Sequence, residues 1–177
     1  MNVSRRTVRT VLAAVTAVLA LLFLAGQASA SNHISPQNAP SGTHLQTGSI
    51  GCSTGGNSVS CTGFELAGVG NTDATVVLEA RYTANIQCTN KGGKLVESHT
   101  HTAVDRTEVT VTSAKNGRLA IPAQMSTAPS ESQILAQADC PNPNWTPNVQ
   151  PGSVMLAGFT YSVTFAGFTA PYILITG

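Results

Sequence analysis

Two histidines and a glutamate alternate along one short stretch of the chain, Glu97-Ser98-His99-Thr100-His101. On an extended strand, residues two positions apart project from the same face. This spacing would therefore present two imidazoles and a carboxylate together, a set of ligands that suits Zn²⁺ or Cu²⁺. The sequence offers Glu97, His99 and His101 as candidate metal ligands. The alternative is that they are ordinary polar side chains of a solvated loop or edge strand.

Other chemistry finds little support in the sequence. Gly93, the two histidines and Asp105 loosely follow the first cupin motif, but no histidine follows His101, so we reject a cupin site. The chain has no G-x-S-x-G elbow, no P-loop and no dinucleotide fingerprint. Its eight acidic residues are scattered and select no pair for glycoside hydrolysis. We therefore expect no cofactor and favour a protein that is not an enzyme.

Trp145 is the only tryptophan, and it follows a proline-rich stretch that begins at Cys140. An exposed Trp145 would be a stacking platform for a sugar or a peptide. A buried one would pack over a disulfide, as the core tryptophan of an immunoglobulin domain does. We favour packing, because a single aromatic side chain makes a thin platform and buried tryptophan contributes much to stability.

The elements that would position these residues are predicted to be strands. The clearest is 75–88, where apolar side chains alternate with polar ones and Cys88 falls on the apolar face. A second strand is predicted at 107–112, and Asn116-Gly117 predicts a hairpin that returns through 118–121. Further strands are predicted at 159–165 and 172–175, with weaker candidates at 58–66 and 96–103.

One segment is ambiguous, because Ser130 and Gln133 could form a capping box for a short helix through Ala138. Such a helix would not change the fold class. Six to eight short strands separated by turns predict an all-β fold, an immunoglobulin-like antiparallel β-sandwich.

All four cysteines, Cys52, Cys61, Cys88 and Cys140, lie after the first thirty residues. An even count in an exported chain predicts two disulfides, and three pairings are possible. We favour Cys52–Cys61, because the Gly55-Gly56-Asn57 sequence between them can reverse the chain. The remaining pair, Cys88–Cys140, would tie a strand end to a distant loop.

Two segments of the sequence match a known pattern, Cys88-Thr89-Asn90-Lys91-Gly92-Gly93 and Cys140-Pro141-Asn142-Pro143-Asn144-Trp145. In these segments the chain resembles a group of small secreted actinobacterial proteins of unknown function. The resemblance covers roughly residues 75–165. It implies the Cys88–Cys140 pairing, but it implies no activity, and Cys52 and Cys61 lie outside the pattern.

The first thirty residues predict a signal peptide, which would form an N-terminal signal helix. Three arginines precede a long apolar run, and Ala28 and Ala30 form an A-x-A site before Ser31. The apolar run is shorter than a membrane-spanning helix requires, so we expect cleavage after Ala30 rather than an uncleaved anchor. The predicted organisation is a signal peptide over 1–30, a flexible lead-in over 31–42 and a secreted β-sandwich domain over 43–177.

Charge limits the partners. Cleavage removes three of nine basic residues and none of eight acidic ones, which leaves six against eight and a formal net charge of −2. This weak charge gives no reason to expect binding to nucleic acid or stable membrane association after cleavage. The expected function is therefore that of a non-enzymatic extracellular binding or surface-interaction module. The alternatives are a secreted metal-binding protein or enzyme that uses Glu97, His99 and His101, and a secreted inhibitor or small-molecule carrier.

Overall fold

The computed structural model of the chain describes residues 30–177. Residues 1–29 of the predicted signal peptide, Ala28 among them, lie outside the described residues. Of the predicted cleavage site, Ala30 packs against the edge of the core and Ser31 is the first residue of a strand.

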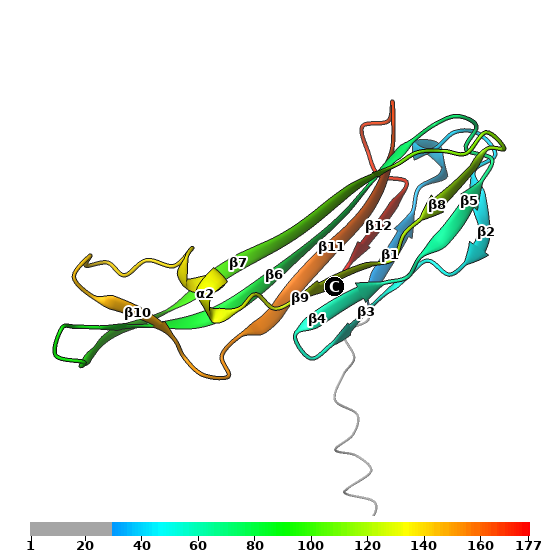
Figure 1. Cartoon of the computed structure of the whole chain (residues 1–177). Coiled ribbons are helices and arrows are strands. Elements are labelled where there is room, and N and C mark those ends of the chain that lie inside the picture. The colour runs from blue at the N-terminus through cyan, green and yellow to red at the C-terminus, as the bar shows by residue number, and fades with distance from the viewer. Residues whose placement is uncertain (1–29) are drawn as a thin grey trace, which may run out of the picture.

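The prediction of a mostly β fold is confirmed, because the described residues form twelve strands joined by turns and one short α-helix (Figure 1). The strands are β1 (Ser31–Ile34), β2 (His44–Gly48), β3 (Cys52–Gly55), β4 (Ser58–Cys61), β5 (Phe64–Ala67), β6 (Ala74–Thr89), β7 (Leu95–Val111), β8 (Arg118–Ile121), β9 (Gln124–Thr127), β10 (Thr146–Val149), β11 (Met155–Phe165) and β12 (Ile173–Thr176). The helix is α2 (Glu131–Leu135), and a 3-10 turn, η1 (Pro36–Asn38), follows β1.

The larger sheet is built on the two longest strands. β7 pairs with β6 along the whole length of β6. On the opposite edge of β6, β11 pairs with its first part and β10 with its last four residues, so β11 and β10 follow one another along that edge. β12 and β1 complete the sheet beyond β11. All of these pairs are antiparallel. At 16 residues, β6 spans roughly 50 Å.

Two smaller sheets, β2-β5-β8 and β3-β4-β9, are formed by the same three runs of chain. Each run is interrupted once, between β2 and β3, between β4 and β5 and between β8 and β9. Gly63 and Pro122 lie at two of these interruptions. A Cβ atom on Gly63 would lie 3.0 Å from the backbone nitrogen of Ala123, so only glycine fits there without a shift. Proline lacks the N–H that a continuous strand would need.

One core lies between the large sheet and the two small ones, and we call this two-layer part the body. The inward side chains of β6 and β11 meet those of β4, β5 and β8 in a cluster of twenty buried residues. The cluster includes Phe64, Leu66, Leu78, Tyr82, Leu119, Tyr161, Phe165 and Ile173. Alternation along β6 is complete from Ala74 to Cys88, as the sequence predicts.

The other ends of β6 and β7 extend beyond the body, and Figure 1 shows β10 and α2 beside them. We call this part, 84–103 with 131–149, the arm. Its smaller cluster contains seven buried residues: Ala84, Ile86, Cys88, Ala103, Ile134, Ala138 and Val149. The capping box is present, because the Ser130 hydroxyl accepts from the Gln133 backbone N–H and Gln133 Oε1 accepts from the Ser130 backbone N–H.

The two disulfides have the pairing that the sequence analysis favours. Cys52 and Cys61 lie directly opposite each other on β3 and β4. Cys88 lies near the end of β6 and is bonded to Cys140, which lies in the arm between α2 and β10. The described residues contain no free cysteine.

The predicted hairpin at Asn116-Gly117 is wrong. The turn itself exists, since the Gly117 N–H donates to the Ala114 carbonyl and Gly117 has a φ of 73°. The strands on its two sides, however, join different sheets, because β7 pairs with β6 and β8 pairs with β5. The chain uses this turn to cross from one layer to the other.

The lead-in over 31–42 also needs correction. Its first residues form β1, which pairs with β12, and both Ser35 and Ala39 are buried. The side chains of β1 are all exposed, so the strand leaves no alternation in the sequence. It forms because β12 offers an edge to which it can bond. Within residues 30–177, no helix has the length and apolar character needed to cross a membrane.

Candidate binding site

Glu97, His99 and His101 project from the inner face of β7 in the arm. In the β6–β7 register they lie opposite Cys88, Ile86 and Ala84, respectively, whose side chains are buried in the arm core. All three are partly buried, whereas their neighbours Ser98 and Thr100 are exposed. The expected alternation is therefore present.

These three residues do not assemble as a metal centre in the structure. Residues two apart on a strand are separated by roughly 7 Å along the chain, so further ligands must come from another element. His99 Nδ1 lies 3.8 Å from Glu97 Oε1. Among residues 30–177, no group of three or more His, Cys, Asp or Glu side chains is placed to hold a metal ion. What the arm presents is a histidine beside a carboxylate, in a groove that Pro141 also lines.

Trp145 is half-buried and packs against the arm core, the cluster that contains Cys88. Its backbone N–H donates to the Asn142 carbonyl at 3.0 Å, which closes a turn just before β10. The residue also lines a hollow of about 530 Å³ beside Pro143 and Pro147. Trp145 therefore has a packed side and a side that faces solvent.

A site that the sequence analysis did not propose lies where the arm meets the body. Its central group is Asp105, on the inner face of β7 opposite Ala80. The Ser126 hydroxyl, from β9, donates to Asp105 Oδ2, and the Tyr82 hydroxyl lies 2.8 Å from Ser126 Oγ. Since Ser126 gives its proton to the carboxylate, it accepts from Tyr82. The result is a chain of hydrogen bonds from the buried core to one oxygen of Asp105.

Burial keeps the Tyr82 hydroxyl protonated. The pKa of Tyr82 is raised above its ordinary value, first because burial disfavours the phenolate and also because Asp105 is negative nearby. The hydrogen bond with Ser126 acts in the opposite direction on the same pKa. Tyr82 therefore stays a neutral donor. Ser126 is only 3% exposed, so its hydroxyl holds the carboxylate in place and is closed to a substrate.

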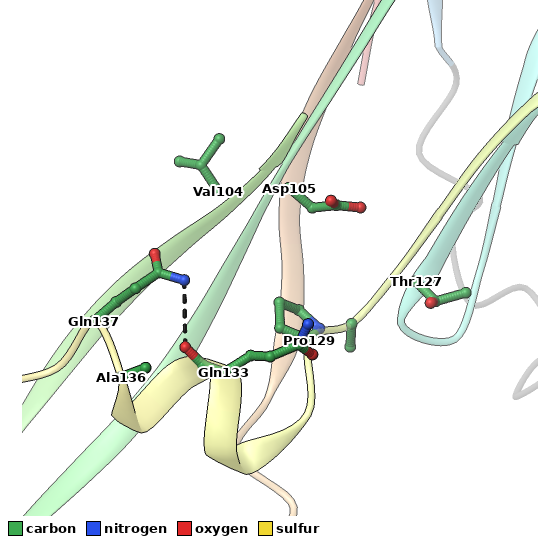
Figure 2. Close-up of a pocket in the computed structure, with 8 residues that line it drawn as sticks. Val104, Asp105, Thr127, Pro129, Gln133, Ala136 and Gln137 are labelled. Carbon is green, nitrogen blue, oxygen red and sulfur yellow. Dashed lines mark hydrogen bonds between the residues drawn. The ribbon is translucent and has the colours of Figure 1, made fainter. Parts of the chain in front are cut away.

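The Asp105 carboxylate faces a pocket of about 400 Å³ (Figure 2). Within the described part of the chain, it has no lysine, arginine or histidine nitrogen within ion-pair distance. Its other oxygen, Oδ1, accepts no hydrogen bond there either. The pocket walls come from β7, from the end of β9 with the segment that follows it, and from α2 with the residues just after it. The lining residues are Val104, Asp105, Thr127, Ala128, Pro129, Gln133, Ala136 and Gln137.

Two amide side chains on this wall keep free polar atoms. Gln137 Nε2 donates to the Gln133 carbonyl at 3.3 Å, so the Gln137 amide oxygen remains available. Gln133 Oε1 is used in the helix cap with Ser130, which leaves its Nε2 available. A fixed carboxylate therefore shares the pocket with an amide acceptor, an amide donor and apolar walls from Val104 and Pro129.

The site contains the groups for binding a ligand and lacks an accessible nucleophile paired with a base. In the sequence Asp105 stands out only as the acid of the rejected cupin motif, and its partner Ser126 lies 21 residues away on another strand. No local pattern connects the two. Comparison with known protein families, with curated proteins and with solved structures finds no match to this chain.

Proposed function

We propose that the protein is a secreted, non-enzymatic β-sandwich of immunoglobulin-like type, which acts as an extracellular binding or surface-interaction module. The observation that carries the proposal is the Asp105 pocket, where a hydrogen-bond chain from the core holds a carboxylate that has no ionic partner among the described residues. Binding sites for small molecules combine apolar walls with a few fixed polar groups in this way.

Secretion is supported by the signal-peptide pattern of the first thirty residues and by the two disulfides. Disulfides form and persist in oxidising compartments and are rare in the cytosol. The immunoglobulin-like type is supported by the two antiparallel layers around one core.

A preorganised group favours binding because little entropy is lost when the ligand arrives. Tyr82 and Ser126 are buried, so they hold the Asp105 carboxylate before any ligand is present. The capping box fixes the start of α2, the element that carries Gln133. Sites built on such rigid elements keep their geometry better than sites on loops.

The test is an NMR titration of the purified, ¹⁵N-labelled protein with two probes, a tryptic digest of casein and chitohexaose. We expect saturable amide shifts in 104–105 and 127–137 with at least one probe, and recovery of that probe unchanged by mass spectrometry. The same titration on Asp105→Asn should lose these shifts, whereas the control Glu108→Gln, on the opposite face of β7, should keep them.

Two outcomes would contradict the proposal. If neither probe shifts these residues at millimolar concentration, the pocket is not a binding site for such ligands. If a probe is recovered cleaved or modified in an Asp105-dependent way, the protein is an enzyme.

A further inference from the structure

The Asp105 pocket opens at the edge of a strand. Val104 and Asp105 are consecutive residues of β7, so their side chains point to opposite faces of the sheet. Both nevertheless line the same pocket, and Figure 2 shows them next to each other on β7, across the pocket from α2, with their side chains pointing in different directions. A pocket reached from both faces must extend around the strand edge that lies between them. A ligand in this pocket is therefore within reach of the backbone of β7.

That edge of β7 has no strand beside it. Within residues 30–177, β7 pairs with β6 alone, and no further backbone hydrogen bond involves Leu95–Val111. Alternate residues of an edge strand direct their N–H and C=O groups away from the sheet. Proteins usually blunt such edges with lysines, prolines or short strands, because an open edge is a template for another strand. β7 has 17 residues and contains neither lysine nor proline.

The charge of the pocket selects the side chain that would enter it. One oxygen of Asp105 is held by Ser126 and the other is free, with no cation within ion-pair distance among the described residues. The arginines of the central part of the sheet are engaged on the outer face, where Arg106 bonds to Glu79 and Glu108. A lysine ammonium is a compact cation with three donors, and the free Asp105 Oδ1 is an acceptor for one of them.

We infer that the open edge of β7 binds an extended peptide segment of another protein as an added strand, with a lysine of that segment in the Asp105 pocket. This inference rests on the proposed function and names its ligand. In strand addition, main-chain hydrogen bonds supply affinity, while pockets for alternate side chains supply specificity. The edge of β7 and the Asp105 pocket would perform these two tasks within one site.

The test uses an acetylated, amidated heptapeptide of alternating threonine and valine with a central lysine, titrated against the purified protein by NMR and calorimetry. Replacing the lysine by norleucine should weaken binding about tenfold or more, because a charge-assisted hydrogen bond is lost. Asp105→Asn should weaken binding of the lysine peptide by a similar factor and leave the norleucine peptide unchanged. Glu108→Gln is the matched control and should change neither affinity.

Two further peptides test the strand addition itself. N-methyl groups are placed on alternate amides, facing one edge in the first peptide and the other edge in the second. Only one peptide edge can face β7, so one methylated peptide should lose binding and the other should retain it. A peptide that lies in the pocket without pairing to β7 would tolerate both patterns, and that result would overturn the strand addition.

Failure of this inference can be distinguished from failure of the proposed function. If chitohexaose shifts residues 104–105 and 127–137 while the lysine peptide does not, only the peptide inference is wrong. If no probe shifts them, both are wrong. A second copy of the chain on the edge would also contradict the inference. Sedimentation at the titration concentration would then show a dimer, and the lysine peptide would not dissociate this dimer.

Discussion

The body and the arm are stabilised by different means, although β6 and β7 run through both. The body encloses twenty buried residues between two layers, among them all three tyrosines. The arm has only seven buried residues, none of them aromatic, and its long crosslink from Cys88 to Cys140 ties the loop to the sheet. A thin layer buries little apolar surface, so the covalent bond and the capped helix take a larger share in the arm.

The body, which has the larger core, and the arm also differ in how many candidate binding hollows they carry. The hollows at Trp145 and at Glu97 are lined by arm residues, and the pocket at Asp105 lies where the arm meets the body. Two of these three hollows therefore lie in the region with the smaller core, and the third lies at its border. Regions that open locally at low free energy are commonly those that bind ligands.

The largest effect should come from removing the arm disulfide. In the variant Cys88→Ser/Cys140→Ser, we expect the free energy of unfolding of the arm to fall by about 4 kcal/mol. The reason is that the disulfide no longer restricts the entropy of a 52-residue loop in the unfolded chain. Trp145 lies in the arm, so its fluorescence should change at a lower urea concentration than the far-UV circular dichroism of the whole sheet. In the wild type the two transitions should coincide.

The matched control is Cys52→Ser/Cys61→Ser, whose loop of nine residues lies in the body. It should cost about 3 kcal/mol and shift both transitions together. If the arm variant also shifts both transitions together, the arm and the body form one cooperative unit and the comparison fails.

Alkaline pH should act on the body. Burial raises the pKa of Tyr82, Tyr161 and Tyr172 above the ordinary value of 10.0. Above pH 10 the unfolded chain releases these protons and the folded chain keeps them, so the free energy of unfolding falls as pH rises. Below about pH 9 these groups contribute no pH dependence. The expected loss is at most about 1 kcal/mol for each tyrosine between pH 10 and 11.

Urea unfolding at pH 8, 10 and 11 measures this loss. Tyr161→Phe should reduce the slope, because the pKa of Tyr161 is raised most strongly and its hydroxyl has no hydrogen-bond partner in the described residues. A stability that is constant up to pH 11 would show that the tyrosines ionise freely in the folded state, which contradicts their burial.

The sequence predicted those parts of the fold that depend on one strand at a time. β6 is predicted within one residue at each end because its apolar side chains alternate without a break on the inner face. The structure has one continuous strand, β7, where the sequence analysis proposes two, 96–103 and 107–112. Two strands are proposed because Asp105 and Arg106 interrupt the alternation of polar and apolar residues in the sequence. The prediction of a turn at Asn116-Gly117 is correct, but the predicted pairing of its two flanking strands is wrong. A turn specifies a local reversal of the chain and does not specify which sheet the next strand joins.

The site was less predictable. Glu97, His99 and His101 stand out because they are close in sequence, but the structure brings no third element with a ligand to them. The Asp105 pocket joins β7, β9 and α2, and the fixed carboxylate depends on a bond between residues 105 and 126. Its chemistry depends on tertiary contacts, which a single sequence does not reveal.

Removing the hydrogen bonds that link Tyr82, Ser126 and Asp105, where the arm meets the body, should have an intermediate effect on the free energy of unfolding. Ser126→Ala removes both hydrogen bonds and leaves the buried Tyr82 hydroxyl without its partner, at an expected cost of about 2 kcal/mol. Tyr82→Phe removes the donor instead and should cost about 1 kcal/mol, because Ser126 can still bond to Asp105. Ser162→Ala, on the outer face of β11 with no side-chain hydrogen bond in the described residues, is the control. Equal stabilities for all three variants, measured by urea unfolding, would show that this chain of hydrogen bonds does not contribute to the free energy of unfolding.

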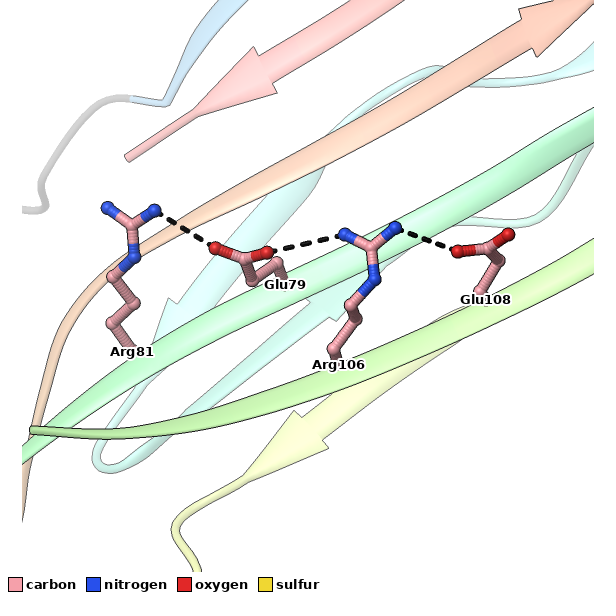
Figure 3. A network of polar contacts seen from close by, with 4 residues as sticks. All are labelled: Glu79, Arg81, Arg106 and Glu108. Atoms are coloured by element: carbon pink, nitrogen blue, oxygen red, sulfur yellow. Dashed lines mark hydrogen bonds and ion pairs between the residues drawn. The ribbon is translucent and has the colours of Figure 1, made fainter.

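The smallest effect is expected on the outer face of the sheet, where four charged side chains alternate in sign (Figure 3). Glu79 contacts Arg81 at 2.9 Å and Arg106 at 3.3 Å, and Arg106 contacts Glu108 at 2.7 Å. The bond to Glu108, followed by the influence of Glu79, raises the pKa of Arg106.

Because these charged groups are solvated, Glu79→Gln should lower Tm less than Ser126→Ala does. The difference from wild type should vanish in about 1 M NaCl, where charges are screened within about 3 Å. Glu65→Gln removes the isolated partner of Arg118 on the small sheet and should have a still smaller effect, because Glu79 serves two arginines and Glu65 only one. A Glu79→Gln effect that persists in high salt would mean that Glu79 acts through packing on β6 rather than through charge.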